Sequence, residues 1–90
     1  MSAEETLRVM VVDDHPMWRE AVVRDLAAAG LDVVATAATG EEALVRARAT
    51  RPAVLVLDLQ IPSPRGVEVT ATLVEELPGL RVLILSLIHI

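Results

Sequence analysis

Three of the five aspartates in the chain directly follow runs of apolar residues. Asp13 and Asp14 follow the run that ends at Val12, and Asp58 follows the run that ends at Leu57. In open parallel α/β sheets, ligands bind outside the carboxyl ends of the strands, where the strand order reverses. If the first and third strands are neighbours, these three carboxylates converge on one pocket.

A cluster of three carboxylates is stable only when a bound cation or raised pKa values offset their repulsion. The chain has no cysteine, so a cation held by oxygen ligands is expected, and Mg²⁺ fits best because it also accepts water and phosphate oxygens. A carboxylate beside Mg²⁺ can attack a phosphoryl group and form an aspartyl phosphate. A single Asp at a strand end is usually a turn residue. Spacing alone therefore leaves two interpretations open, a metal or phosphate pocket and a set of turn residues.

Strand-length apolar runs alternate with helix-length segments along the whole chain, which predicts a parallel sheet with helices on both faces. A capping-box pattern that begins at Thr39 starts the second helix. Apolar periodicity and turn residues predict strands over residues 7–12, 32–36, 53–57 and 81–85, and helices over 17–29, 39–49 and 67–77.

The first helix carries the only aromatic residue, Trp18, on the same face as Val22 and Leu26. This periodicity predicts that Trp18 packs into the core and does not bind a partner. Proline is favoured in the first turn of a helix, so the pair His15–Pro16 is interpreted as the start of this helix and not as a ligand.

The composition excludes several function classes. The chain has 90 residues, enough for one small domain, and 53% of them are hydrophobic, which argues against disorder. Without cysteine it has no disulfide, thiolate zinc site or cysteine nucleophile. A formal net charge of −5 predicts no nucleic-acid contact, and the apolar runs are too short to span a membrane. A cytoplasmic protein is therefore expected.

Two stretches around the aspartates are similar to motifs of one family. Residues 11–16 read VVDDHP and are followed by Arg19 and Glu20, and residues 55–62 read LVLDLQIP and are followed by Gly66. The first stretch resembles the opening of response-regulator receiver domains, most closely of those with a helix-turn-helix DNA-binding output domain. The second resembles the phospho-acceptor strand and the loop after it. The resemblance covers essentially the whole chain up to residue 83 or 84.

The resemblance implies a flavodoxin-like α/β fold, a doubly wound parallel sheet with strand order 2-1-3-4. It implies that Asp58 is the phospho-acceptor and that Mg²⁺ is held by Asp13, Asp14, Asp58 and the backbone carbonyl of Gln60. Ser86 stands where the family has a Ser or Thr that hydrogen-bonds the phosphoryl group and switches the domain.

The resemblance also implies the partners. The phosphoryl donor would be a sensor histidine kinase of a two-component system, and the phosphorylated protein would form a homodimer. In the intact protein the receiver would control transcription through an output domain. It would act as a binding and switching module and not as an enzyme in the usual sense.

The sequence departs from the family at two places. Residues 61–66 read IPSPRG, where the family usually has Met-Pro-Gly and further small residues. The chain also stops after the fourth strand, so residues 1–90 are interpreted as a partial receiver domain without its last helix, strand and helix, and without the lysine at the end of the fifth strand. Residues 85–90 read LSLIHI, as one frame of a common transposon-based sequencing adaptor would, and are hypothesised to be a non-native tail. A natural short protein is the alternative.

Two other functions stay open. An aspartate-nucleophile phosphatase would need a second Asp two residues after its nucleophile, and the Gln at position 60 counts against it. A pseudo-receiver would only bind a partner without being phosphorylated. The presence of Asp13, Asp14 and Asp58 counts against that function.

Overall fold

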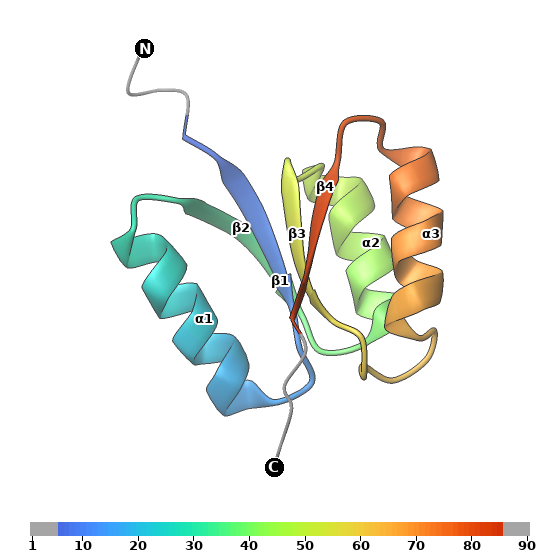
Figure 1. Ribbon diagram of the computed structural model, residues 1–90, viewed down its shortest axis with the longest axis horizontal. Helices are drawn as coiled ribbons and strands as arrows, with labels where there is room; N and C mark the ends of the chain where they lie inside the picture. Colours follow the sequence, from blue (N-terminus) through green and yellow to red (C-terminus); the bar gives the residue numbers. More distant parts are fainter. Residues whose placement is uncertain (1–5, 86–90) are drawn as a thin grey trace.

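The computed structural model describes residues 6–85, in which strands and helices alternate as the sequence predicts (Figure 1). Each observed boundary lies within one residue of its predicted position. The elements are β1 (Arg8–Val12), α1 (Pro16–Ala28), β2 (Asp32–Ala37), α2 (Gly40–Thr50), β3 (Val54–Asp58), α3 (Gly66–Glu76) and β4 (Arg81–Leu85).

The four strands form one parallel sheet with the order β2-β1-β3-β4, which confirms the predicted fold class and strand order. The strand order reverses between β1 and β3, because the chain moves outward from β1 to β2 and then returns to the other side of β1. Val12 of β1 pairs with Leu57 of β3. The residues that follow this pair, Asp13 and Asp58, therefore lie side by side at one edge of the sheet.

The helices form a layer on each side of the sheet (Figure 1): α1 covers one face, while α2 and α3 lie next to each other over the opposite face. Successive strand residues point to opposite faces, so β1 and β3 contribute apolar side chains to both layers. Towards α2 and α3 the buried residues of these two strands are Met10, Val12, Leu55 and Leu57, and towards α1 they are Val9, Val11 and Val56.

The start of α2 shows the predicted capping box in a modified form. The Glu42 N–H donates to Thr39 Oγ1 at 3.1 Å, as the pattern predicts. The Glu42 carboxylate accepts from the Ala38 N–H at 2.9 Å, one residue before the expected donor. The first contact satisfies an N–H group that the helix leaves unpaired, and the second ties the residue before the N-cap to the first turn, so the two contacts fix where α2 begins.

The prediction that Trp18 packs into the core is wrong. Val22 and Leu26 pack against the buried residues under α1, but Trp18 remains 48% exposed, and its neighbour Met17 is 85% exposed. The apolar stripe of α1 therefore extends one turn beyond the sheet residues that it covers. Within residues 6–85, no helix combines the length and hydropathy that crossing a bilayer requires.

Candidate functional site

The three predicted carboxylates meet at the carboxyl ends of β1 and β3, as their position after paired strands requires. One side-chain ligand atom from each of Asp13, Asp14, His15 and Asp58 can be chosen so that all lie within 4.8 Å of one another. Asp13 is 2% exposed and Asp58 6% exposed. Two carboxylates are thus almost fully buried at the point where the strand order reverses, which is the usual ligand site of such sheets.

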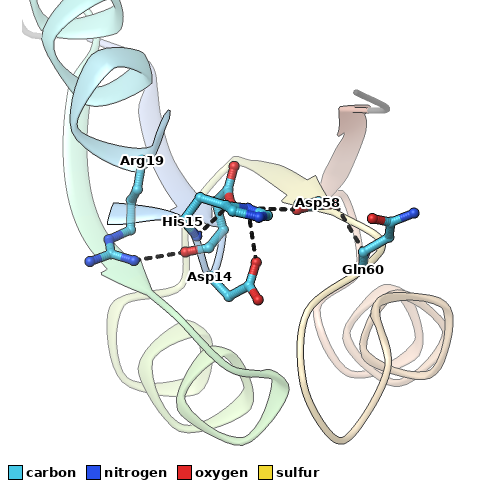
Figure 2. Close-up of polar contacts among 6 residues, drawn as sticks. Asp14, His15, Arg19, Asp58 and Gln60 are labelled. Carbon is cyan, nitrogen blue, oxygen red and sulfur yellow. Dashed lines mark hydrogen bonds and ion pairs between the residues drawn. The ribbon is translucent and has the colours of Figure 1, made fainter. Parts of the chain in front are cut away.

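Backbone contacts hold Asp13 firmly in place. Its N–H donates to the Ala37 carbonyl at 3.0 Å, which extends the pairing of β1 with β2 by one residue. Its own carbonyl accepts from Arg19 Nη1 at 2.8 Å, and its Oδ1 accepts from the His15 N–H at 2.9 Å (Figure 2). The loop between β1 and α1 is therefore fixed before any ligand binds.

The His15 ring lies among the carboxylates (Figure 2). Its Nδ1 is 2.9 Å from Asp13 Oδ1, 3.0 Å from Asp14 Oδ1 and 3.8 Å from Asp58 Oδ2. The hydrogen bond with Asp13, followed by the negative charge of Asp14, raises the pKa of His15 above its ordinary value of 6.5, although partial desolvation opposes the change.

The sequence predicted only the position of the His15 backbone at the start of α1. The residue is the N-cap of α1, and Pro16 follows in the first turn, as predicted. The contacts of its ring with three carboxylates were missed. Their only sequence signal is the position of His15 directly after the Asp13–Asp14 pair.

The two oxygens of Asp58 have different surroundings. Oδ1 accepts a hydrogen bond from the Gln60 N–H at 2.9 Å (Figure 2). Oδ2 faces the His15 ring and accepts no hydrogen bond from any residue in the described part of the chain. Asp58 therefore has one oxygen held by the backbone and a second oxygen directed at the other carboxylates.

The loop after Asp58 is anchored to the start of α2. The Gly40 N–H donates to the Pro62 carbonyl at 2.9 Å. A Cβ at Gly40 would overlap the Pro64 carbonyl, and one at Gly66 would lie 2.6 Å from Leu59 Cα. Two positions without a side chain thus let the backbone of residues 59–64 lie against α2 and α3. Gln60 lies in this loop, and its role as a carbonyl ligand stays a prediction.

The donor set fits a hard divalent cation. Asp14 Oδ1 is buried and has no hydrogen-bond partner among the described residues, although it lies 3.0 Å from His15 Nδ1. A ring nitrogen carries at most one proton, and the hydrogen-bonding geometry of Nδ1 is with Asp13. Ionised carboxylates only accept, so the buried Asp14 Oδ1 needs a donor or cation that residues 6–85 do not supply, and Asp58 Oδ2 is free to bind the same cation. Ser86 and the rest of the predicted tail after Leu85 lie outside the described residues.

Comparison with known proteins shows the family to which the chain belongs. Residues 9–89 match the response regulator receiver domain family. The chain is 42% identical over 77 residues to the response regulator GacA of Pseudomonas protegens, covering 84% of this chain and 36% of that protein. It is 43% identical over 82 residues to the DNA-binding transcriptional activator DevR/DosR of Mycobacterium tuberculosis, covering 89% of this chain and 37% of that protein.

A solved structure shows the same fold. The signal receiver domain of the response regulator NarL from Mycobacterium tuberculosis superposes with a TM-score of 0.83 at 40% identity, covering 89% of this chain and 65% of that one. The chain thus spans little more than a third of the length of the curated relatives named above. Its sequence match, its strand order and the NarL superposition agree, and the chain belongs to the response-regulator receiver domain family.

Proposed function

We propose that this chain accepts a phosphoryl group on Asp58 from a sensor histidine kinase, with Mg²⁺ held by Asp13, Asp14, Asp58 and the Gln60 carbonyl. The observation that carries the proposal is the convergence of these carboxylates. Two of them are almost fully buried, and Asp14 Oδ1 is enclosed without a hydrogen-bond donor. A purely structural cluster would have its acceptor oxygens paired within the protein.

Asp58 Oδ2 is the proposed nucleophile. The Gln60 N–H engages Oδ1 and fixes the rotation of the carboxylate, which leaves Oδ2 directed into the pocket. In the transfer, an Oδ2–phosphorus bond forms while the bond between phosphorus and the donor breaks. The electron pair of the broken bond leaves with the donor, which is the histidine nitrogen of the kinase.

Asp13 and Asp14 supply the negative charge that holds the cation beside Asp58. Mg²⁺, when bound, neutralises charge on the transferring phosphoryl oxygens. The contacts of Asp13 with Arg19, His15 and the end of β2 keep the acidic pair in position, so little of the site has to be ordered when the ion binds.

The signalling role extends beyond this chain. The relative DevR/DosR is named a DNA-binding transcriptional activator, and the chain covers only 37% of it. We propose that phosphorylation here controls transcription through an output domain. Ser86 would act as the switch residue, and phosphorylated receivers would pair as a homodimer. The domain would then be a switch and not a multiple-turnover enzyme.

The test is incubation of the chain with Mg²⁺ and acetyl phosphate, followed by intact-protein mass spectrometry. We expect a mass increase of one phosphoryl group that is absent in Asp58→Asn and present in Asp25→Asn, a control at an exposed aspartate of α1. Failure to form the adduct while Mg²⁺ still binds would disprove the proposed acceptor role. Continuous release of phosphate over many turnovers would favour a phosphatase, and the absence of both adduct and Mg²⁺ binding a pseudo-receiver.

A further inference from the structure

His15 places a nitrogen donor among the three carboxylates, and the geometry leads us to infer a second class of ligand. We infer that the site also binds a late first-row transition cation such as Zn²⁺, with His15 Nδ1 as a ligand, in competition with Mg²⁺. The inference rests on the proposed metal-binding role of this pocket. It adds a ligand residue and a cation class to that role.

The distances around His15 Nδ1 suit coordination. Two neighbouring ligands, each about 2.1 Å from a cation, lie about 3.0 Å apart in an octahedral site and about 3.4 Å apart in a tetrahedral one. The Nδ1 atom is 2.9 Å from Asp13 Oδ1 and 3.0 Å from Asp14 Oδ1. Its distance of 3.8 Å to Asp58 Oδ2 falls between that range and the about 4.2 Å expected for ligands on opposite sides. The nitrogen is therefore close enough to each of the three oxygens to share a cation with it.

A single hydrogen bond from the His15 ring cannot satisfy all the carboxylate oxygens around it. The single proton that Nδ1 can carry serves Asp13 Oδ1, and the enclosed Asp14 Oδ1 has no hydrogen-bond partner. The Asp58 side chain is 8% exposed and directs Oδ2 at the same ring. Two oxygens thus lie close to a nitrogen whose one hydrogen bond is already made. A cation that displaces the Nδ1 proton to solvent would be bound by the nitrogen lone pair and by both oxygens at once.

The protein also holds His15 in place before a metal arrives. Its backbone N–H donates to Asp13 Oδ1, and Pro16 restricts the backbone at the start of α1. The ring is 53% exposed, so an ion can reach Nδ1 from solvent without any opening of the fold. A ligand that is already ordered loses little conformational freedom on binding, which strengthens the binding of any ion that accepts nitrogen.

The His15 nitrogen raises the affinity of the site for some cations more than for others. Mg²⁺ prefers oxygen ligands and keeps several waters, so His15 adds little to its affinity. Imidazole suits Zn²⁺, Ni²⁺ and Co²⁺, which also bind mixed nitrogen and oxygen sites more tightly than earlier metals of the series do. Zn²⁺ and Mg²⁺ would share Asp13, Asp14 and Asp58 as ligands, so each ion would displace the other from the pocket.

The experiment is calorimetric titration of the full 90-residue chain with Zn²⁺ alone and with Mg²⁺ alone, at one pH, for wild type, His15→Gln and His89→Gln. His89 is the other histidine of the chain and serves as the matched control. We expect wild type to bind one Zn²⁺ at least about tenfold more tightly than Mg²⁺. His15→Gln should lose at least about tenfold in Zn²⁺ affinity and none in Mg²⁺ affinity. His89→Gln should match wild type for both ions.

Co²⁺ absorption gives an independent readout of nitrogen coordination. The visible spectrum of bound Co²⁺ should differ between wild type and His15→Gln, and circular dichroism should show that both are folded. Equal Zn²⁺ affinity in wild type and His15→Gln would overturn the inference, as would binding of Mg²⁺ without binding of Zn²⁺, and in either case the proposed function stands. Zn²⁺ binding that depends on His15 but is not accompanied by Mg²⁺ binding would support the nitrogen site and contradict the proposed function.

Discussion

The helices on the two faces of the sheet bury their side chains to different extents, although β1 and β3 contribute aliphatic side chains to both faces. On one face, α3 buries Val69 and Leu73 completely. On the other, no residue of α1 is buried, and Trp18 at its first turn is about half exposed. A hydrophobic pattern thus predicts which side of a helix faces the sheet. It does not predict how far that side is removed from water.

The number of helices in each layer explains the difference. Over one face, α2 and α3 lie side by side (Figure 1), so each covers the flank of the other as well as the sheet. The described part of the other layer contains only α1, whose two flanks remain open to solvent. Burial on a face therefore depends on neighbours in the same layer, and mutations in the two layers should differ in cost.

The largest effect is expected from Leu73→Ala in α3. Leu73 is 0% exposed, so the substitution removes buried methyl groups and leaves a cavity. We expect a loss of about 2–5 kcal/mol in the free energy of unfolding. Urea unfolding followed by circular dichroism measures it. A loss below about 1 kcal/mol would mean that this layer is packed no better than the α1 layer.

Gly40→Ala tests whether the α2 and α3 layer also positions the loop after Asp58. The new Cβ would overlap the Pro64 carbonyl, so the loop or the first turn of α2 must shift. We expect a loss of about 1–3 kcal/mol in the free energy of unfolding, together with slower phosphorylation of Asp58. Glu41→Ala, at an exposed neighbour, is the control for changed helix propensity. Unchanged stability and unchanged phosphorylation would show that the loop does not depend on this contact.

Leu26→Ala is the counterpart of Leu73→Ala in the α1 layer. Leu26 packs against the cluster formed by Val9, Val11 and Val56 but stays partly exposed. Because solvent can fill part of the vacated space, we expect a loss of about 1–2 kcal/mol, measured by the same urea unfolding. Losses of equal size at Leu26 and Leu73 would remove the proposed difference between the layers.

Trp18→Ala should change stability least among the apolar substitutions, by no more than about 1 kcal/mol, because a side chain that is about half exposed leaves no enclosed cavity. Tryptophan fluorescence of the wild type checks the same point, since an exposed indole emits at long wavelength and is quenched by added iodide. Emission typical of a buried indole, or a large loss of stability, would contradict the observed exposure.

Trp18 also marks where prediction from the sequence ends. Periodicity placed it on the correct stripe of α1, but the length of sheet beneath that stripe is a tertiary property that no local pattern contains. The carboxylate pocket was predictable because its rule is topological. Parallel strands that are neighbours end at one edge, so Asp13 and Asp58 had to meet once β1 and β3 paired.

The ring of His15 illustrates the opposite case. Its place at the start of α1 follows from Pro16, but the direction of its side chain depends on the turn between β1 and α1. That turn is set by the hydrogen bonds of Asp13 with Arg19 and with the His15 backbone. These contacts join residues up to six positions apart, and no apolar periodicity encodes them.

The smallest effect is expected from the ion pair that joins α2 to α3. Within the described residues α1 has no neighbouring helix in its layer and so makes no contact of this kind. Arg48 Nε and Nη2 donate to the Glu76 carboxylate at 2.7 and 2.8 Å, and this hydrogen bonding holds the pKa of Glu76 below its ordinary value of 4.5. Because the pKa of Glu76 is lower in the folded state, the pair stabilises the fold at pH values above the pKa of Glu76 in the unfolded state. This contribution is lost as the pH falls through the pKa of Glu76 in the folded state.

Arg48→Ala should therefore destabilise the protein slightly at neutral pH, by less than Leu26→Ala, and progressively less as the pH falls below 4.5. Both side chains are well exposed, so added salt should reduce the difference as well. Urea unfolding of wild type and variant at several pH and salt values measures both trends. A difference that persists in acid and at high salt would mean that Arg48 acts through packing of its aliphatic stem across α2 and α3. The advantage of the two-helix layer would then come from apolar burial alone.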